Sequence, residues 1–474
     1  MSRERKDFLL LLVLAAVVRI PGLDTGLWFD EIQMGAELLG RSFRDLLTAY
    51  PSDNNHPGYT WLAWLSTHLF GGAPWVVRLP AYVAGVFSPF ALYRFIRRVD
   101  QRETALTAAV LLAISSHAVM FSQNARGYSA LLLLTILATD TYHKLVTEND
   151  RRAGFPYALK VGLATWFHTT AVFVALGHAL VALPRCLRRK TYHPLAALVG
   201  AGFVSLLLHA PILRPMWQFF SAAETGRGDW DWTRPFWALQ ESLQSFGVPL
   251  WAVVPALAAG FFTFVMGLRH LARLDRPLPA LLFLPPVLGG TFLVLAGRNL
   301  WPRFFFFATG FFLWASVTGI DALARMTARA LGRAHLAPVL RRGALVLMGV
   351  ILAWRLPAVW TLPKQDYVGA LSAVRARAAD GDLIGAAGLA VLPYQAYYDE
   401  KLPEITGRNI SEIASHLAPK RSLWVLTTFP VFTESKDPEL ARWLSTHARL
   451  VARRRGLIGG GDILIYRVSS PPGR

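Results

Sequence analysis

Cysteine is almost absent from this sequence, which has only Cys186 among 474 residues. This excludes an intramolecular disulfide, so any folded part outside a membrane must be stable through packing alone. Charged residues are also scarce, at 17% of the chain, and acids are the rarer kind, with 30 Asp and Glu against 49 Lys and Arg. Internal repeats and low-complexity tracts are missing, so a repeat architecture is not expected.

Hydrophobic residues are abundant instead, at 54% of the chain with a mean hydropathy of +0.36. Apolar runs recur over the first three quarters of the sequence at the length of about 20 residues that a membrane-spanning helix needs. The net charge of +19 would favour nucleic-acid binding in a soluble protein. Here Lys and Arg gather in short loops at alternate ends of the apolar runs, as in membrane proteins. We therefore expect a polytopic membrane protein with no nucleic-acid partner.

The pattern predicts an all-α membrane domain over residues 1–360 with about 11 transmembrane helices. The basic start is followed by an apolar run without a small-residue cleavage site, which favours an uncleaved first span and a cytoplasmic N-terminus. Residues 21–78 are then expected to form an external loop. Residues 157–183 fit one long tilted helix or two short, partly re-entrant ones, and we favour two because this keeps the charge pattern regular.

The last part of the chain, residues 361–474, differs in composition and predicts a small external (periplasmic) α/β domain. A helical pattern covers 367–379, and short strand patterns cover 383–387, 423–428, 450–452 and 463–468. The glycines of this part do not complete a dinucleotide-binding fingerprint. We assign this domain no catalytic role.

Two adjacent acids, Asp30 and Glu31, follow the first apolar run directly. One interpretation is structural: Asp30 caps a helix, and Gln33 returns a hydrogen bond in a capping box. The other interpretation is catalytic, and the two do not exclude each other.

Further polar residues are predicted to lie near the same outer face of the membrane. Polar groups at membrane depth are costly, so their convergence suggests a functional site. For His56 a structural role in the turn Asn55-His56-Pro57 is the alternative, and two of the arginines, Arg298 and Arg303, could instead extend to the lipid headgroups. The candidate substrate-binding residues are His56, Arg78, Gln123, Arg126, Tyr128, His168, Arg298 and Arg303.

Carboxylates and arginines at such a surface suit glycosyl transfer from a polyprenyl-phosphate sugar. The lipid tail needs a groove in the membrane, and the planar guanidinium of Arg pairs phosphate oxygens two at a time. The acceptor hydroxyl needs one carboxylate as general base. A separate general acid is not required, because a neutralised lipid phosphate is already a leaving group.

Four motifs follow one another in the first part of the chain: Leu27-Trp28-Phe29-Asp30-Glu31, His56-Pro57-Gly58-Tyr59, Arg78-Leu79-Pro80 and Phe121-Ser122-Gln123-Asn124-Ala125-Arg126-Gly127-Tyr128. Their order resembles the GT-C superfamily of membrane glycosyltransferases. More narrowly, it is similar to the bacterial branch related to protein O-mannosyltransferases and the lipid A aminoarabinose transferase. The Pro302-Arg303-Phe304 element and the segment Pro363–Tyr367 also resemble that branch.

The resemblance implies that Asp30 is the catalytic base and that Glu31 assists it or binds an ion. Two departures are visible. This chain has His-Pro-Gly at 56–58 where the family commonly has His-Pro-Pro, which would loosen the turn. Near Asn124 it lacks the carboxylate with which many relatives hold a divalent metal. A cofactor such as Mg, Mn or Zn is therefore left open, and Arg126 is the alternative source of positive charge.

The sequence as a whole predicts an inverting glycosyltransferase in the bacterial inner membrane. The expected partners are a polyprenyl-phosphate sugar donor, an envelope acceptor (lipid, polysaccharide or protein) and membrane lipids. The alternatives are a transporter or flippase for lipid-linked sugars, a non-catalytic scaffold, and a metal-dependent phosphotransferase. A transporter would place its ionisable residues deep in the spans rather than at one face.

Overall fold

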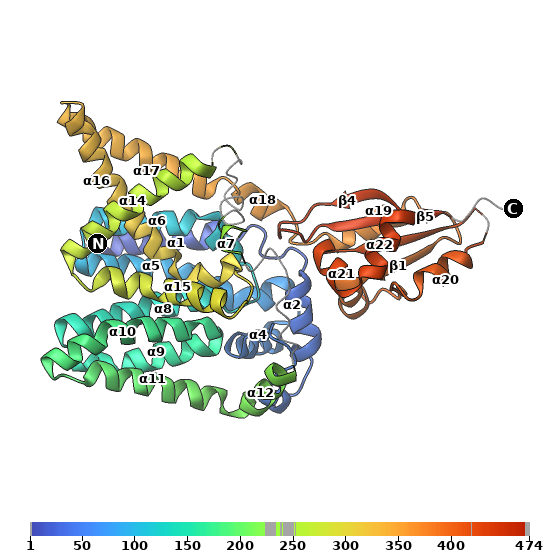
Figure 1. Ribbon diagram of the computed structural model, residues 1–474, viewed down its shortest axis with the longest axis horizontal. Helices are drawn as coiled ribbons and strands as arrows, with labels where there is room; N and C mark the ends of the chain where they lie inside the picture. The colour runs from blue at the N-terminus through green and yellow to red at the C-terminus, as the bar shows by residue number, and fades with distance from the viewer. Residues whose placement is uncertain are drawn as a thin grey trace. The chain divides into compact units, whose positions relative to one another are not determined.

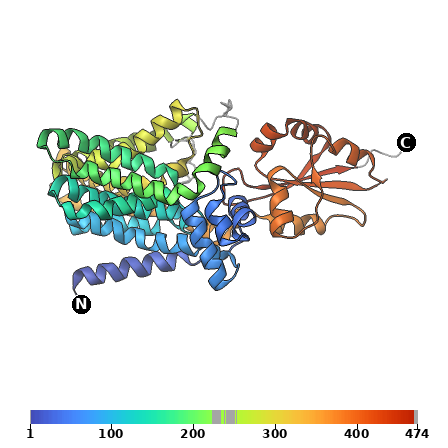
Figure 2. The same cartoon turned by 90° about the horizontal axis from the view of Figure 1, so that it is seen from below.

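The computed structural model describes residues 2–222, 234–237, 239, 251, 253–418 and 420–469. Its contacts divide the chain into two units. The first unit is Met1–Pro21, Leu46–Gly72 and Val76–Pro357, and its described elements are helices. The second unit is Gly22–Asp45, Ala73–Trp75 and Ala358–Arg474, and it contains a five-stranded sheet. The expected fold class, a helical membrane part followed by a small α/β domain, is confirmed (Figures 1 and 2).

The helices of the first unit run largely side by side (Figures 1 and 2). Two short helices, α3 (Phe43–Thr48) and α18 (Leu356–Thr361), lie where the chain changes unit. The others are α1 (Arg3–Arg19), α4 (Pro57–Phe70), α5 (Pro74–Val99), α6 (Arg102–Ile114), α7 (Ser116–Ser122), α8 (Tyr128–His143), α9 (Gly154–Phe167), α10 (Val172–Arg189), α11 (His193–His209), α12 (Leu213–Ala222), α14 (Val253–Leu274), α15 (Leu278–Leu295), α16 (Thr309–Ala330) and α17 (Ala337–Ala353).

Seven helices in the described part of the chain are long and apolar enough to cross a membrane, and the pair α6 and α7, bent by 59°, makes an eighth candidate. Three more helices, α1, α8 and α9, are shorter, with 17, 16 and 14 residues. Because seven or eight candidate spans are found among the described residues, the number of about 11 stays a prediction. The protein is a multi-pass membrane protein.

Residues 157–183 belong to two helices, as favoured from the sequence, but the second is not the short, partly re-entrant helix that was expected, since Thr169–Arg189 is long and apolar enough to cross a membrane. The first, α9, ends at Phe167, and the second, α10, begins at Val172 after a short 3₁₀ turn. His168 lies at the break in extended conformation, with φ −162° and ψ 125°. Helix α9, which ends at this break, packs against α8 and α11 (Figure 1).

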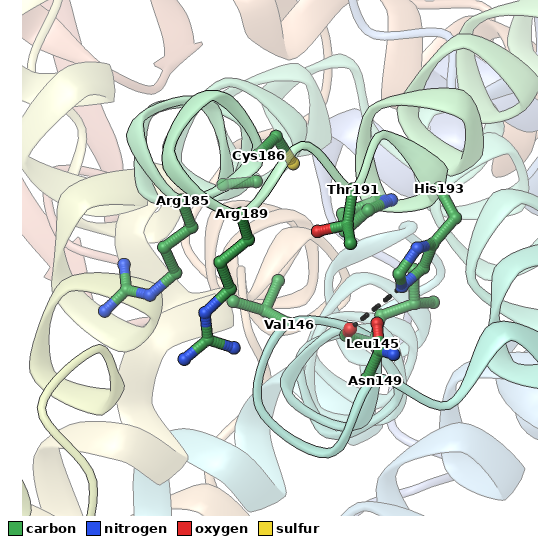
Figure 3. A pocket seen from close by; sticks show the side chains of 10 residues that line it. Leu145, Val146, Asn149, Arg185, Cys186, Arg189, Thr191 and His193 are labelled. Carbon is green, nitrogen blue, oxygen red and sulfur yellow. Dashed lines mark hydrogen bonds between the residues drawn. The ribbon is translucent and has the colours of Figure 1, made fainter.

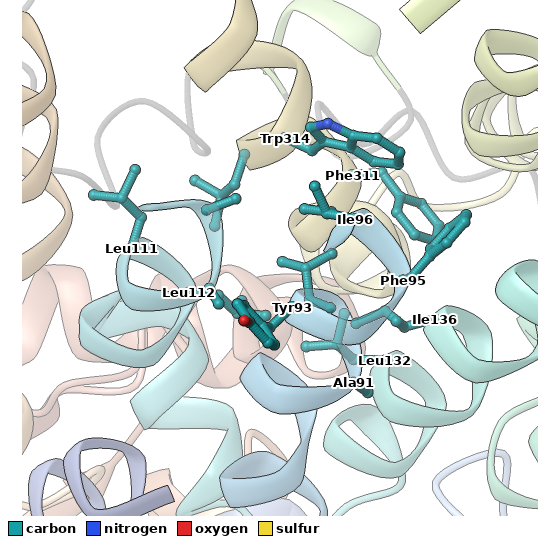
Figure 4. Close-up of a cluster of buried hydrophobic side chains, with 14 of the residues drawn as sticks. Ala91, Tyr93, Phe95, Ile96, Leu111, Leu112, Leu132, Ile136, Phe311 and Trp314 are labelled. Carbon is teal, nitrogen blue, oxygen red and sulfur yellow. The ribbon is translucent and has the colours of Figure 1, made fainter. Parts of the chain in front are cut away.

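The largest hydrophobic core of the first unit joins α5, α6, α8 and α16 (Figure 4). Phe95 packs edge to face on Trp314 with ring centroids 5.5 Å apart, and both side chains are fully buried. Aromatic pairs of this geometry contribute about 0.5–1.5 kcal/mol beyond their buried area. The core therefore fixes the helices from which the polar loops extend.

The sheet of the second unit has the order β2-β1-β3-β5-β4. Strand β1 is parallel to its neighbours β2 and β3, whereas β5 is antiparallel to both β3 and β4. All strands predicted from the sequence are present, and the two-residue β2 was not predicted. The strands are β1 (Leu383–Ala387), β2 (Glu404–Ile405), β3 (Ser422–Thr427), β4 (Arg449–Arg454) and β5 (Ile463–Ser469).

Helices cover both faces of this sheet, so the central strand β3 is buried throughout and reads as one apolar run. Residues Leu423 and Val425 face a core with α20 (Ile410–Ser415) and α22 (Pro438–His447). Trp424 and Leu426 face a second core with α19 (Tyr367–Arg375). The remaining helix is α21 (Pro430–Lys436).

Two side chains of the predicted external loop, Leu27 and Ile32, belong to the α19 core and are 3% and 1% exposed. Their burial explains why Gly22–Asp45 groups with the C-terminal residues and not with the helical unit. The sequence placed the Asp-Glu motif within the 1–360 domain; its packing partners lie beyond residue 360.

Candidate functional site

The acid pair lies in the first turn of α2 (Phe29–Met34), and its two members differ in exposure. Glu31 is completely buried, whereas Asp30 is half-buried. Glu31 Oε2 accepts a hydrogen bond from the Trp28 N–H at 3.2 Å, which satisfies a free donor at the helix start. The capping box expected from Asp30 and Gln33 is therefore wrong: Glu31 caps the helix, and Gln33 Nε2 donates to Glu37 at 2.8 Å.

Two residues of the C-terminal part hold this turn. Lys364 Nζ lies 3.4 Å from Glu31 Oε1, and the two side chains are 3% and 0% exposed. Gln365 Oε1 accepts hydrogen bonds from the Phe29 N–H at 2.8 Å and from the Tyr367 hydroxyl at 3.0 Å. The sequence analysis did not identify Lys364 and Gln365 as partners of the acids. The only sequence feature that pointed to them was their place in the motif Pro363–Tyr367.

The charge of Asp30 acts on the same aromatic core. The pKa of Tyr367 is raised well above its ordinary value, first by burial, then by the neighbouring Tyr394 and Tyr398, and then by Asp30. Asp30 therefore lies within electrostatic reach of the Tyr367 ring while keeping part of its surface accessible.

A second polar group lies in the first unit, where three loops meet. His56 precedes α4, Tyr128 begins α8, and His168 separates α9 from α10. The His56 ring centroid is 4.8 Å from that of His168 and 5.6 Å from that of Tyr128, and the Tyr128 and His168 rings are 4.9 Å apart. All three side chains are buried. We call this set, with Arg126 and Arg303, the His–Arg cluster.

Hydrogen bonds fix the tautomers of both histidines. His56 Nδ1 lies 3.0 Å from the Phe167 carbonyl oxygen, which can only accept, so the neutral ring carries its hydrogen on Nδ1. His56 Nε2 is then a bare lone pair, and it is buried with no hydrogen-bond partner among the described residues. His168 Nδ1 accepts from the Thr170 N–H at 3.2 Å, so its hydrogen is on Nε2. The Tyr128 hydroxyl is also buried without a partner in the part of the chain that the structure describes.

Two guanidinium groups make the His–Arg cluster positive. Arg126 lies over the Tyr128 ring at 5.6 Å, and Arg303 lies over the Trp301 ring at 5.0 Å. Burial lowers the pKa of His56 well below its ordinary value, and Arg126, His168 and Arg303 lower it further. Burial, with Arg126 and Arg303, lowers the pKa of His168 to about 3. Both histidines stay neutral, so the cluster offers positive charge from arginine and hydrogen-bonding groups from its rings, which suits an anion.

Two glycines allow the loops to approach this closely. A Cβ on Gly127 would lie 2.0 Å from the Phe167 carbonyl oxygen, and one on Gly58 would lie 2.9 Å from the Trp166 ring. Gly58 is buried in the first turn of α4. The glycine at this position therefore accommodates the Trp166 ring.

The other candidate residues have different surroundings. Arg78 is fully buried near the start of α5, whereas Arg298 is exposed after the end of α15. Gln123 Nε2 donates to the carbonyl oxygens of Arg19 and Pro21, at 3.0 and 2.6 Å. Both amide hydrogens of Gln123 thus hold the end of α1. Its role in substrate binding stays a prediction.

A separate pocket lies at the end of α10 and is lined by Arg185, Arg189, Thr191 and His193 (Figure 3). It shares no residue with the acid pair or the His–Arg cluster. Within the described ranges, no three His, Cys, Asp or Glu side chains lie together as a metal site would need.

Comparison with known proteins gives a family match over part of the chain and a similar fold. Residues 54–214 match the model of the dolichyl-phosphate-mannose-protein mannosyltransferase family. The chain is similar to the crystal structure of ArnT from Cupriavidus metallidurans in the apo state, with a TM-score of 0.54, 15% identity and 100% of each chain covered. The same ArnT bound to undecaprenyl phosphate gives a TM-score of 0.50 and 13% identity, covering 98% of this chain and 99% of that one. None of the curated protein sequences compared with this chain matches it.

The resemblance to GT-C membrane glycosyltransferases related to protein mannosyltransferases and ArnT is thereby confirmed. The family match covers a stretch that contains His56, Arg126, Tyr128 and His168. At 15% identity the structural likeness describes the fold, and the substrates have to be argued from the residues.

Proposed function

We propose that the protein is an inverting glycosyltransferase that moves a sugar from a polyprenyl-phosphate donor to an acceptor of the cell envelope, at the outer face of the membrane. The observation that carries this proposal is the His–Arg cluster. Two buried groups there, His56 Nε2 and the Tyr128 hydroxyl, lie beside two guanidinium groups and have no hydrogen-bond partner within the described ranges. A buried polar group without a partner costs about 1–3 kcal/mol, so such atoms suit a ligand that completes them.

The donor carries phosphate oxygens for the two arginines and sugar hydroxyls for His56 and Tyr128. Its phosphate oxygens accept from the planar forks of Arg126 and Arg303. Its sugar hydroxyls both donate and accept, so one of them can donate to His56 Nε2 and another can accept from Tyr128. Arg78 is assigned to the surroundings of the donor by its place in the Arg78-Leu79-Pro80 motif and His168 by its place in the His–Arg cluster. Arg298 is assigned there by its predicted position at the outer face of the membrane. One of the similar structures holds undecaprenyl phosphate, a lipid of the class proposed here.

Asp30 is the proposed general base. It accepts the proton of the acceptor hydroxyl as that oxygen attacks the anomeric carbon of the sugar. The bond from the anomeric carbon to the phosphate oxygen breaks, and its electron pair leaves with the polyprenyl phosphate. The arginines stabilise the charge that develops on this leaving group. One displacement of this kind inverts the anomeric configuration.

The test is donor turnover by the purified protein in nanodiscs, with labelled polyprenyl-phosphate sugars and an envelope extract as acceptor. Loss of a general base typically lowers the rate by a factor of about 10² to 10⁴, so Asp30→Asn should lose transfer. Asp45→Asn, an exposed acid of the same segment, is the matched control and should keep it. Near-normal transfer by Asp30→Asn would contradict the assignment, and donor binding without sugar release in the wild type would favour a transporter.

A further inference from the structure

Adjacent carboxylates are electrostatically unfavourable unless one of them is compensated. In this chain Lys364 lies 3.4 Å from Glu31, and both side chains are buried. Removing one partner of a buried ion pair leaves an uncompensated charge and costs about 3–5 kcal/mol. Lys364 is therefore the group that lets Glu31 stay buried, where its other oxygen caps α2 through the Trp28 N–H.

Gln365 fixes the backbone next to Asp30. Its Oε1 accepts from the N–H of Phe29, the residue directly before Asp30, at 2.8 Å. Its Nε2 donates to Thr428 Oγ1 at 3.0 Å and to the Gly461 carbonyl oxygen at 3.2 Å. The amide oxygen and the amide nitrogen are thus both engaged, so the side chain has one orientation.

The segment that carries Lys364 and Gln365 is itself anchored in the C-terminal part. The carbonyl oxygens of Pro363 and Lys364 accept from the N–H groups of Leu457 and Ile458, at 3.0 and 3.2 Å. A Cβ on Gly456 would lie only 2.4 Å from the Lys364 carbonyl oxygen, so the close approach requires glycine there. The contacts therefore form a continuous connection from the loop after β4 to the first turn of α2.

We propose that Lys364 and Gln365 are positioning residues for Asp30. Lys364 compensates the buried charge of Glu31, which leaves Asp30 as the accessible acid of the pair, and Gln365 holds the peptide that orients it. The C-terminal domain then has a direct part in catalysis that its sequence did not reveal. This inference rests on the proposed function of Asp30 as the base.

The first test compares steady-state kinetics of sugar transfer. Small displacements of a catalytic group cost up to about 10²-fold, so Lys364→Met and Gln365→Asn should lower kcat by about 10- to 100-fold with the donor KM nearly unchanged. Lys364→Arg keeps the charge and should recover most of kcat. The double variant Glu31→Gln, Lys364→Met removes both charges and should be more active than Lys364→Met alone.

Arg375→Met is the matched control, because Arg375 forms an ion pair with Glu400 in the same domain but is 56% exposed. It should leave kcat and KM unchanged. Wild-type kcat in Lys364→Met, a loss confined to KM, or a double variant no better than Lys364→Met would overturn the proposal.

The second test does not depend on turnover. Hydrogen–deuterium exchange of the peptide covering 28–34 should be faster in Gln365→Asn than in the wild type, because the Phe29 N–H loses its acceptor. Unchanged exchange there would overturn the positioning role even if Asp30 proves to be the base. Conversely, full transfer by Asp30→Asn together with faster exchange in Gln365→Asn would contradict the proposed function and keep the structural connection.

Discussion

His56 donates a hydrogen bond from Nδ1 to the carbonyl oxygen of Phe167 at 3.0 Å, across 111 residues of sequence. This bond joins the start of α4 to the break between α9 and α10. It also leaves His56 Nε2 as a buried lone pair that has no hydrogen-bond partner among the described residues. Nδ1 of His56 thus has a structural role, whereas Nε2 is available to a ligand.

The two nitrogens of His56 can be tested separately. The amide of an asparagine ends near the position of Nδ1, so His56→Asn can keep the bond to Phe167 while removing the lone pair of Nε2. We expect its melting temperature to stay within a few degrees of the wild type while transfer falls by about 10-fold or more, and His56→Ala to lose both. The measurements are thermal unfolding and donor turnover. Normal transfer by His56→Asn would make the histidine purely structural.

Arg303 should bind the donor phosphate through its fork rather than by charge alone. Arg303→Ala should weaken donor binding by about 10- to 100-fold, and Arg303→Lys by less, because Lys keeps the charge but loses the paired hydrogen bonds. Donor affinity in nanodiscs measures both. Exposed Arg298 provides the comparison, since Arg298→Ala should have the smaller effect of the two alanine variants. Equal affinities for Arg303→Ala and Arg303→Lys would indicate that Arg303 only reaches the headgroups.

His168 predicts a dependence of stability on pH. Its pKa is about 3 in the folded protein against 6.5 ordinarily, so the unfolded chain binds the proton more readily. The stability that neutral His168 contributes is complete above pH 6.5 and is lost as the pH falls from 6.5 toward 3. At pH 4.5 the loss amounts to about 2–3 kcal/mol.

The check is the melting temperature of wild type and His168→Gln between pH 7 and pH 4.5. The variant should lose less stability over this interval, while His68→Gln, at an exposed histidine of the same unit, should follow the wild type. Parallel curves for wild type and His168→Gln would show that His168 is protonated as easily in the folded state as in the unfolded state.

Much of the fold could be predicted because it follows from hydropathy and periodicity. The break at His168 and the strands β1, β3, β4 and β5 are all visible as local patterns. The missed strand, β2, has only two residues, Glu404 and Ile405, and exists because β1 pairs with it. No local pattern could reveal it.

The surroundings of the acid pair were not predictable for a related reason. Asp30 and Gln33 match the spacing of a capping box, but Glu31 makes the cap because Lys364 compensates its burial. More than three hundred residues separate Glu31 from Lys364. Local spacing can suggest a capping residue. Which of the two adjacent acids caps the helix depends on Lys364, which only the tertiary structure brings near.

At Gly58, packing and helix propensity predict opposite changes in the free energy of unfolding for Gly58→Ala. Alanine is favoured over glycine inside a helix by about 0.5–1 kcal/mol, so propensity alone predicts that Gly58→Ala stabilises α4. A Cβ at this position would lie 2.9 Å from Trp166 Cε3 and 3.0 Å from its Cδ2, on a ring held between neighbouring aromatic side chains. Overpacking of a buried site costs about 1–3 kcal/mol, which exceeds the gain in propensity.

Gly58→Ala should therefore lower the free energy of unfolding, while Gly72→Ala, with open space around its Cβ, should change it by less than about 0.5 kcal/mol. Denaturant unfolding of the two variants in the same detergent decides between the two effects, and a stabilised Gly58→Ala would mean that Trp166 moves aside without loss.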